Sequence, residues 1–235
     1  MSLENNIQII RNFLLERYKN NLAAILIFGS ANTNHFRDSK SDIDHMIFLK
    51  RLGGIDVSEE IKFLFEKLKS ENFASQYFND LQGLKDYIKN RKSFSTYITI
   101  ASKDGSRTVY TTPEFERTRE YLRKHPPTKE EIKEHLKEKD EFELNGYFKK
   151  IKGYDLTKAL MSHLRRKLQV MNYFQTEGLI FDYTACLNNR EINQEDKKKL
   201  EKLYKTYEKR ATLADEEIDY YRNLAREFTN RIIQS

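Results

Sequence analysis

Two aspartates, Asp42 and Asp44, are the residues of this chain most suited to chemistry, and they follow a Gly29-Ser30 pair by a short polar stretch. Side chains at positions i and i+2 of a strand project to the same face, so the two carboxylates would lie together while Ile43 points into the core. Two like charges so close repel each other unless a cation lies between them. Mg²⁺ prefers carboxylate and phosphate oxygens, so the pair predicts a catalytic magnesium site with Asp42 and Asp44 as metal ligands.

Gly29 and Ser30 predict a turn that binds phosphate. A residue without Cβ lets the backbone approach a phosphate closely, and Ser30 can donate from both its N–H and its hydroxyl. The spacing matches neither the G-x-x-x-x-G-K-[ST] loop nor the G-x-G-x-x-G fingerprint. The alternative is a plain turn followed by a solvated strand edge, and it is the combination of both pairs that favours a phosphate site.

This stretch resembles the polymerase β-like nucleotidyltransferase superfamily. An apolar strand ends in Gly29-Ser30, a polar loop follows, and Ser41, Asp42 and Asp44 begin a second strand, all within residues 23–50. The order of elements extends the resemblance to kanamycin-type and streptomycin-type nucleotidyltransferases. It implies nucleotide binding by Gly29, Ser30 and Ser41, one or two Mg²⁺ ions on the aspartates, and transfer of a nucleoside monophosphate from an NTP. We expect ATP as donor, a hydroxyl as acceptor and pyrophosphate as the released product.

A third carboxylate is the point at which the sequence departs from this pattern. The resemblance implies a further metal ligand or general base on a later strand, but residues 73–78 contain no acid. Gln76 is one occupant of that place, and a neutral amide cannot accept the proton of the acceptor. The base is then absent, or it is Asp80, Glu141 or Glu143. A second hypothesis follows, in which the chain is a catalytically impaired nucleotide-binding or toxin-neutralising module of the same fold.

Other titratable side chains are weaker candidates. Arg37, Lys40 and the basic cluster at 165–167 could steady the pyrophosphate, although charged helix faces are common in solvated helices. By strand alternation His45 points away from the face of Asp44, so we interpret it as a core or partner-facing histidine. The acceptor could be an antibiotic-like small molecule, a protein or an RNA, because no motif specifies it.

Hydrophobic periodicity predicts the elements that position the motif. Residues 23–28 and 43–49 are apolar strands that we expect side by side, after a first helix near 3–18. The predicted elements that follow are a helix opened by Asp56 and Glu59, a strand over 73–78, a helix over 81–89, and a hairpin of 93–102 with 107–110 turning at Asp104-Gly105. From Pro113 onward helix signals dominate. The fold class is therefore α+β, with a small mixed-sheet nucleotidyltransferase domain at 1–115 followed by an all-α helical bundle at 116–235.

Composition excludes several classes of protein. The 235 residues carry a net charge of +6 with both signs interspersed, which gives no basic arm for nucleic acid. The single Cys186 and five scattered histidines exclude an internal disulfide framework and a zinc knuckle. The longest apolar run, 22–28, is too short to span a membrane. We expect a cytoplasmic protein without membrane contact, and the sequence is compatible with a homodimer.

Overall fold

The computed structural model describes residues 2–32, 42–91, 94–102 and 104–235. The chain forms two compact units, the first made of residues 1–91 with 99–126 and the second of 92–98 with 127–235. Each unit has its own architecture, as the α+β class predicts: a mixed sheet with helices in the first unit and helices alone in the second. The functional division at residues 115 and 116 stays a prediction.

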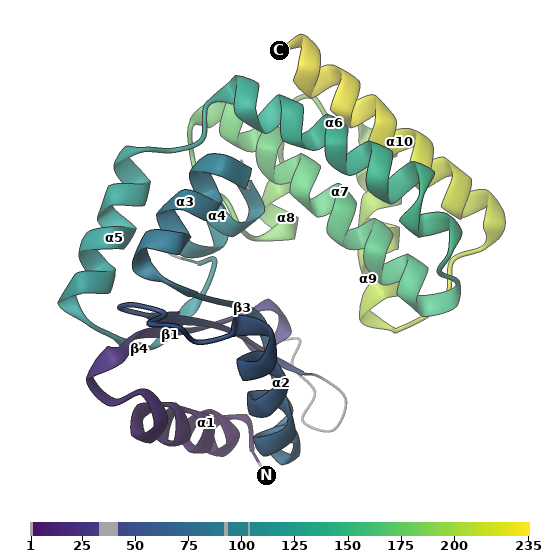
Figure 1. Ribbon diagram of the computed structural model, residues 1–235. Coiled ribbons are helices and arrows are strands. Elements are labelled where there is room, and N and C mark those ends of the chain that lie inside the picture. Colours follow the sequence, from purple (N-terminus) through teal and green to yellow (C-terminus); the bar gives the residue numbers. More distant parts are fainter. Residues whose placement is uncertain (1, 33–41, 92–93, 103) are drawn as a thin grey trace. The chain divides into compact units, whose positions relative to one another are not determined.

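A four-stranded mixed sheet forms the centre of the first unit (Figure 1). Its strands are β1 (Leu22–Phe28), β2 (Ile43–Leu49), β3 (Phe73–Asp80) and β4 (Arg107–Thr111), in the spatial order β3-β2-β1-β4. β1 is antiparallel to both β2 and β4, whereas β3 runs parallel to β2. The prediction that residues 23–28 and 43–49 lie side by side is confirmed. Both strands are almost entirely buried, which explains their unbroken apolar sequence.

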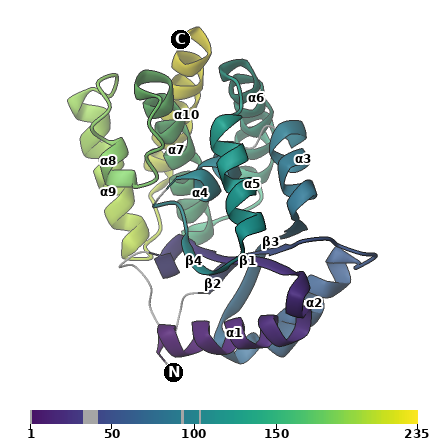
Figure 2. The same ribbon diagram turned by 90° about the vertical axis from the view of Figure 1, so that its left-hand side faces the viewer.

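Helices cover both faces of this sheet (Figure 2). On one face lie α1 (Leu3–Tyr18) and α2 (Val57–Lys67), where Ile10 and Leu14 join a buried cluster with Ile25 and Ile47. On the other lie α3 (Leu81–Arg91) and α5 (Pro113–Lys124), whose Phe115 ring packs 5.1 Å from that of Phe48. Short 3₁₀ turns η1 (Lys19–Asn21), η2 (Gly29–Asn32) and η3 (Lys69–Glu71) connect the elements.

The predicted hairpin of 93–102 with 107–110 is wrong. Residues 94–101 form helix α4 (Phe94–Ala101), and β4 pairs with β1 instead. The β-branched and aromatic residues of this segment favour a strand, but that preference is weak and tertiary contacts override it. Here Arg119 Nε donates to Ile100 O and Arg123 Nε to Ala101 O, each at 2.9 Å. These two bonds satisfy carbonyls that the end of a helix leaves without partners.

The second unit is a bundle of helices, as predicted. It contains α6 (Lys129–Asn145), η4 (Tyr147–Lys149), α7 (Gly153–Thr176), α8 (Tyr183–Cys186), α9 (Gln194–Glu208) and α10 (Asp215–Gln234). The capping box of Thr128 and Glu131 opens α6. α7 lies at the centre, against α8, α9 and α10 (Figure 1), and buries Leu160, Leu164 and Leu168. No helix in the described ranges is long and apolar enough to cross a membrane.

Candidate active site

Gly29 and Asp44 meet at the end of β1. The last residue of β1, Phe28, lies directly opposite Asp44 on β2, and Gly29 then opens the turn η2 with φ +68°. A Cβ built on residue 29 would lie 2.7 Å from Oδ2 of Asp44, closer than side chains tolerate. Glycine is therefore required here for its backbone angle and for the space that the carboxylate occupies. The structure brings the predicted phosphate turn and one predicted metal ligand into direct contact.

Asp42 directly precedes β2. Ile43 between the two aspartates is fully buried, and its N–H donates to Asn72 O at 2.7 Å, which joins the start of β2 to the residue before β3. Because Ile43 points into the core beside α1 and α2, the residues flanking it project to the opposite face. Asp42 is exposed and Asp44 is half-buried, so the pair lies at the rim of the sheet where a solvated ligand can reach both.

The turn has a second neighbour that the sequence analysis missed. Ile27 lies opposite Arg107 on β4, and Asn32 Nδ2 donates to Asp104 O at 3.1 Å, so the segment 104–106 flanks η2 on the side away from β2. The hydroxyl of Ser106 is buried and has no hydrogen-bond partner in the described part of the chain. A buried hydroxyl without a partner is costly, which makes Ser106 a candidate donor to a ligand. The segment was missed because the predicted hairpin paired β4 with the wrong neighbour.

Some predicted residues lie outside the described part of the chain. Ser41, Arg37 and Lys40 belong to the segment 33–41, and their predicted roles stay predictions. The backbone of Gln76 lies within β3, at a register shift between Ser75 and Tyr77 where β2 has no residue to match it. Such an extra residue is a β-bulge.

Ala74 is the residue of β3 that is paired with Asp44. The two residues face each other across the parallel pair of β2 and β3, and neighbouring strands place paired side chains on the same face. The residue of β3 that is paired with Asp44 therefore carries a methyl group and no acid. Of the sequence alternatives for a base, the structure contradicts Asp80.

Asp80 lies at the end of the sheet opposite to Asp44. It pairs with Leu49, so its position along the strands is about 17 Å from that of Asp44 at roughly 3.3 Å per residue. Its Oδ1 accepts from Gly83 N at 2.7 Å and its Oδ2 from Leu52 N at 3.1 Å. Asp80 therefore caps the first turn of α3 and has no role beside Asp44.

Glu143 and Glu141 lie on α6 of the second unit. Glu143 is buried, and its Oε2 receives His163 Nδ1 at 2.5 Å together with a hydrogen bond from Arg166. Burial would raise the pKa of Glu143, but the hydrogen bond from His163 and the charge of Arg166 outweigh it and hold the pKa at about 2. So acidic a carboxyl is a weak base. Glu141 is exposed and accepts from Asn145 Nδ2 at 2.7 Å.

His45 belongs to the core and not to the aspartate face, as predicted. Its ring stacks on Phe73 at 5.0 Å and its Nδ1 lies 2.6 Å from Ile43 O. Burial lowers the pKa of His45 to about 4, so the imidazole is neutral at physiological pH. The neutral ring donates from Nδ1 to the carbonyl of Ile43, the residue between the two aspartates.

The donor set suits Mg²⁺ bound together with a phosphate. Among the described residues no group of three or more acidic, histidine or cysteine side chains gathers as a metal cage. Asp42 and Asp44 instead offer a pair of carboxylates beside the Gly29 turn, where Oδ2 of Asp44 occupies the space next to the glycine. Mg²⁺ is commonly held by one or two carboxylates and completed by substrate phosphates and water.

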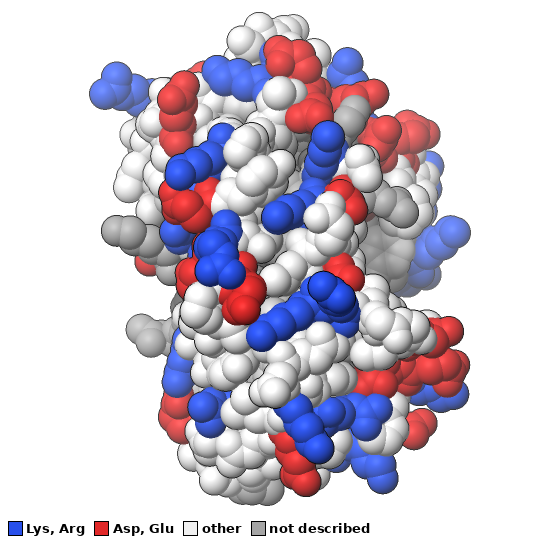
Figure 3. Space-filling view, turned by 60° about the vertical axis from the view of Figure 1, so that its left-hand side comes forward, with Lys and Arg blue, Asp and Glu red and all other residues white. Residues whose placement is uncertain are grey.

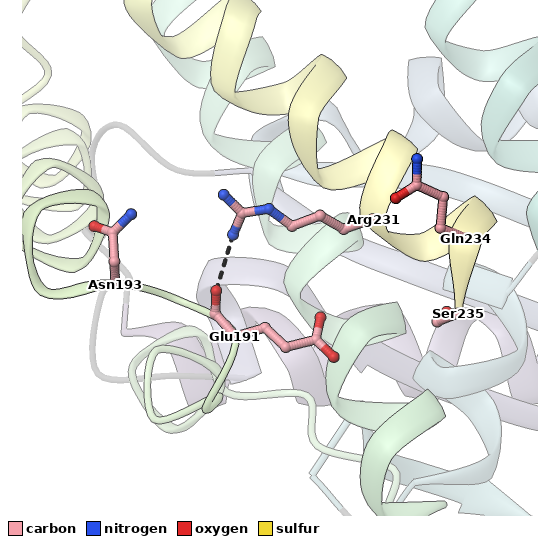
Figure 4. A pocket seen from close by; sticks show the side chains of 5 residues that line it. All are labelled: Glu191, Asn193, Arg231, Gln234 and Ser235. Carbon is pink, nitrogen blue, oxygen red and sulfur yellow. Dashed lines mark hydrogen bonds between the residues drawn. The ribbon is translucent and has the colours of Figure 1, made fainter.

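Two surface features of the described residues can be compared with this site. On the face shown in Figure 3, Lys and Arg side chains alternate with Asp and Glu, as interspersed charges predict. A shallow hollow of the second unit, lined by Glu191, Asn193, Arg231, Gln234 and Ser235, contains none of the predicted site residues (Figure 4). Arg231 there donates to Glu191 O at 2.8 Å.

Comparisons with known proteins show what the fold is. No family model matches the sequence, and no curated protein matches it. The structure is similar to the crystal structure of spectinomycin adenyltransferase AAD(9) from Enterococcus faecialis with ATP and spectinomycin, with a TM-score of 0.63 and 12% sequence identity over 97% of this chain and 99% of that chain. At this identity the likeness shows the fold alone. The chain has the polymerase β-like nucleotidyltransferase fold, with its helical region at the C-terminal end, as the sequence resemblance implies.

Proposed function

We propose that this protein is a Mg²⁺-dependent nucleotidyltransferase that moves a nucleoside monophosphate from ATP to an acceptor hydroxyl. The single observation that carries the proposal is the contact between the Gly29 turn and the carboxylate of Asp44, two residues after Asp42. A phosphate-binding turn and a metal-binding carboxylate pair are the two parts that nucleotidyl transfer needs in one place. The similarity to an adenyltransferase fold supports nucleotidyl transfer in general.

Each residue has a distinct part in this reaction. Asp42 and Asp44 would hold the metal, and Gly29 with Ser30 would bind phosphate oxygens through backbone N–H groups and the serine hydroxyl. Bound Mg²⁺ supplies neutralisation of the phosphate charge. The acceptor oxygen forms a bond to the α-phosphorus, the bond from that phosphorus to the bridging oxygen breaks, and pyrophosphate leaves with the bonding electrons. The hydroxyl proton passes to water or to a base that stays unassigned.

We propose a small molecule as the first acceptor class to test. The similar solved structure contains ATP and spectinomycin. Pocket shape decides acceptor choice within a shared fold, so protein and RNA acceptors belong in the same experiment. Pyrophosphate release from ATP and Mg²⁺ would be measured across aminoglycosides, aminocyclitols, tRNA and denatured protein.

Two substitutions test the chemistry directly. Asp42→Asn and Asp44→Asn keep the side-chain size and remove the metal-binding charge, so each should abolish acceptor-dependent pyrophosphate release. Asp104→Asn is the matched control, because Asp104 is an exposed acid near the same turn that meets Asn32 through its backbone carbonyl. Release that survives both aspartate substitutions would refute this assignment of the chemistry.

A second function, nucleotide binding without turnover, is favoured by Ala74. The residue that faces Asp44 across β3 cannot accept a proton or bind a metal. Under this alternative ATP binds in the presence of Mg²⁺ with the same dependence on Asp44, but no acceptor in the panel releases pyrophosphate. ATP binding should therefore be measured by calorimetry together with pyrophosphate release.

A further inference from the structure

Two exposed aromatic rings are stacked on the surface of the second unit. Phe142, near the end of α6, is 67% exposed, the largest fraction among the large apolar side chains of the described residues, and Tyr147 of η4 is 45% exposed. Their ring centres are 6.5 Å apart and their planes differ by 4°. Single apolar side chains are ordinary on a surface, but neighbouring ones form a patch that suits an interaction. We name these two side chains the aromatic pair.

The backbone between the two rings holds them in this arrangement. Gly146 ends α6, and a Cβ built on it would lie 2.8 Å from Phe142 O, so this turn of the chain requires a glycine. Arg222 of α10, the helix beside α6 (Figure 1), donates to Phe148 O at 2.9 Å and fixes η4 in place. The aromatic pair is therefore pre-organised, and little entropy is lost when a partner covers it.

Charges of opposite sign lie on the two sides of the aromatic pair. Glu138 is exposed one helical turn before Phe142 on the same face of α6, and Lys149 and Lys150 are exposed just after Tyr147. None of these three charges has an ion-pair partner within the described part of the chain. The surface is thus acidic at one end, aromatic in the middle and basic at the other end.

We propose that the aromatic pair is the centre of an interface between two copies of this chain. A two-fold axis uses the same surface on both copies, so that surface must be complementary to itself. Rotation about an axis through the aromatic pair places Glu138 of each copy opposite Lys149 and Lys150 of the other. A polyanion such as RNA would instead be repelled by the acidic end, so these charges favour a second copy. This inference does not depend on the proposed function.

Sedimentation velocity of the full chain tests the interface at protein concentrations from about 1 to 200 µM, a range that covers micromolar affinity. The unaltered protein should pass from monomer to dimer. Phe142→Ser and Tyr147→Ser should each weaken the dimer by about tenfold or more, as the loss of a central aromatic residue does in other interfaces. Phe65→Ser is the matched control, because Phe65 is a 51% exposed phenylalanine of the first unit, and it should leave the dimer unchanged.

Charge reversal tests the two-fold arrangement, which an unspecific aromatic contact does not require. Glu138→Lys should weaken self-association, and so should Lys149→Glu combined with Lys150→Glu, because each variant brings like charges together. An equimolar mixture of these two variants should form mixed dimers as readily as the unaltered protein dimerises, since every opposed pair again has opposite signs.

Circular dichroism spectra of all these proteins should coincide, because every substituted side chain is exposed. The proposal is overturned if the unaltered chain stays monomeric at every concentration, which would leave this surface to a partner of another sequence. It is also overturned if Phe142→Ser associates as tightly as Phe65→Ser, or if the mixture of charge variants associates no better than each variant alone.

Discussion

Oδ2 of Asp44 lies 2.7 Å from the point where a Cβ of residue 29 would stand, so the residue between strand and turn is fixed by a carboxylate on the neighbouring strand. This contact joins the Gly29-Ser30 turn to the aspartate pair, and the segment 33–41 separates the two in the sequence. It also makes the glycine testable by itself, because its requirement has two separable parts, the positive φ and the space beside Asp44.

Gly29→Ala should abolish nucleotide binding at a modest cost in stability. The positive φ costs an alanine about 1–2 kcal/mol, and the added methyl group additionally displaces the carboxylate of Asp44. Gly53→Ala is a matched control, since Gly53 has φ +58° and nothing within 4 Å of an added Cβ. Both variants should lose similar stability in urea, and only Gly29→Ala should lose ATP affinity. Equal ATP affinity in the two variants would contradict the importance of the contact.

Asp140→Asn should destabilise the second unit by about 3–5 kcal/mol. Lys167 is completely buried, and Asp140 Oδ1 lies 2.5 Å from its Nζ. Removal of one partner leaves the other charge buried without compensation, which is the costly way to break such a pair. Urea unfolding measures the loss. Glu120→Gln breaks the exposed contacts of Glu120 with Arg123 and Lys124 and should cost less than about 1 kcal/mol.

Acid should weaken the second unit through Glu143. Its pKa is about 2 in the folded chain and near 4.5 in an unfolded one, so the folded state binds fewer protons between these values. The contribution of Glu143 to the free energy of unfolding is therefore fully present above about pH 4.5 and is lost as the pH falls toward 2. Urea midpoints at pH 7, 5 and 3.5 should fall less steeply for Glu143→Gln than for the unaltered protein. Glu141→Gln, at an exposed neighbour, should keep the original slope; equal slopes in all three proteins would refute the assignment.

Local patterns predicted most of the elements, and non-local pairing explains what they missed. β1 and β2 are short apolar runs bounded by polar turns, and the helix caps at Asp56 and Thr128 depend on residues within one turn. The β-branched and aromatic residues of α4 favour a strand. The hydrogen bonds that cap the end of this helix come instead from Arg119 and Arg123, which lie on the next helix. A local sequence pattern does not predict hydrogen bonds to such distant residues.

The residues of the candidate site also fall into those that local spacing predicts and those that depend on strand pairing. Asp42 and Asp44 could be placed on one face from their spacing, and His45 on the other, because strand alternation is local. The residue beside Asp44 could not be assigned, since it depends on the register between β2 and β3 and on the bulge at Gln76. Ala74 was therefore identified only from the structure.

Ala74→Glu should raise the rate of nucleotidyl transfer. A glutamate there would stand on the same face as Asp44, on a strand paired with β2, where it can accept a proton or complete the metal site. A positioned general base contributes about 10²–10⁴-fold to rate, so acceptor-dependent pyrophosphate release should rise by about two orders of magnitude. Ala74→Gln adds the same volume without the charge and should give no increase. If both variants release pyrophosphate at the rate of the unaltered chain while ATP binding is retained, the missing carboxylate is not what limits this site.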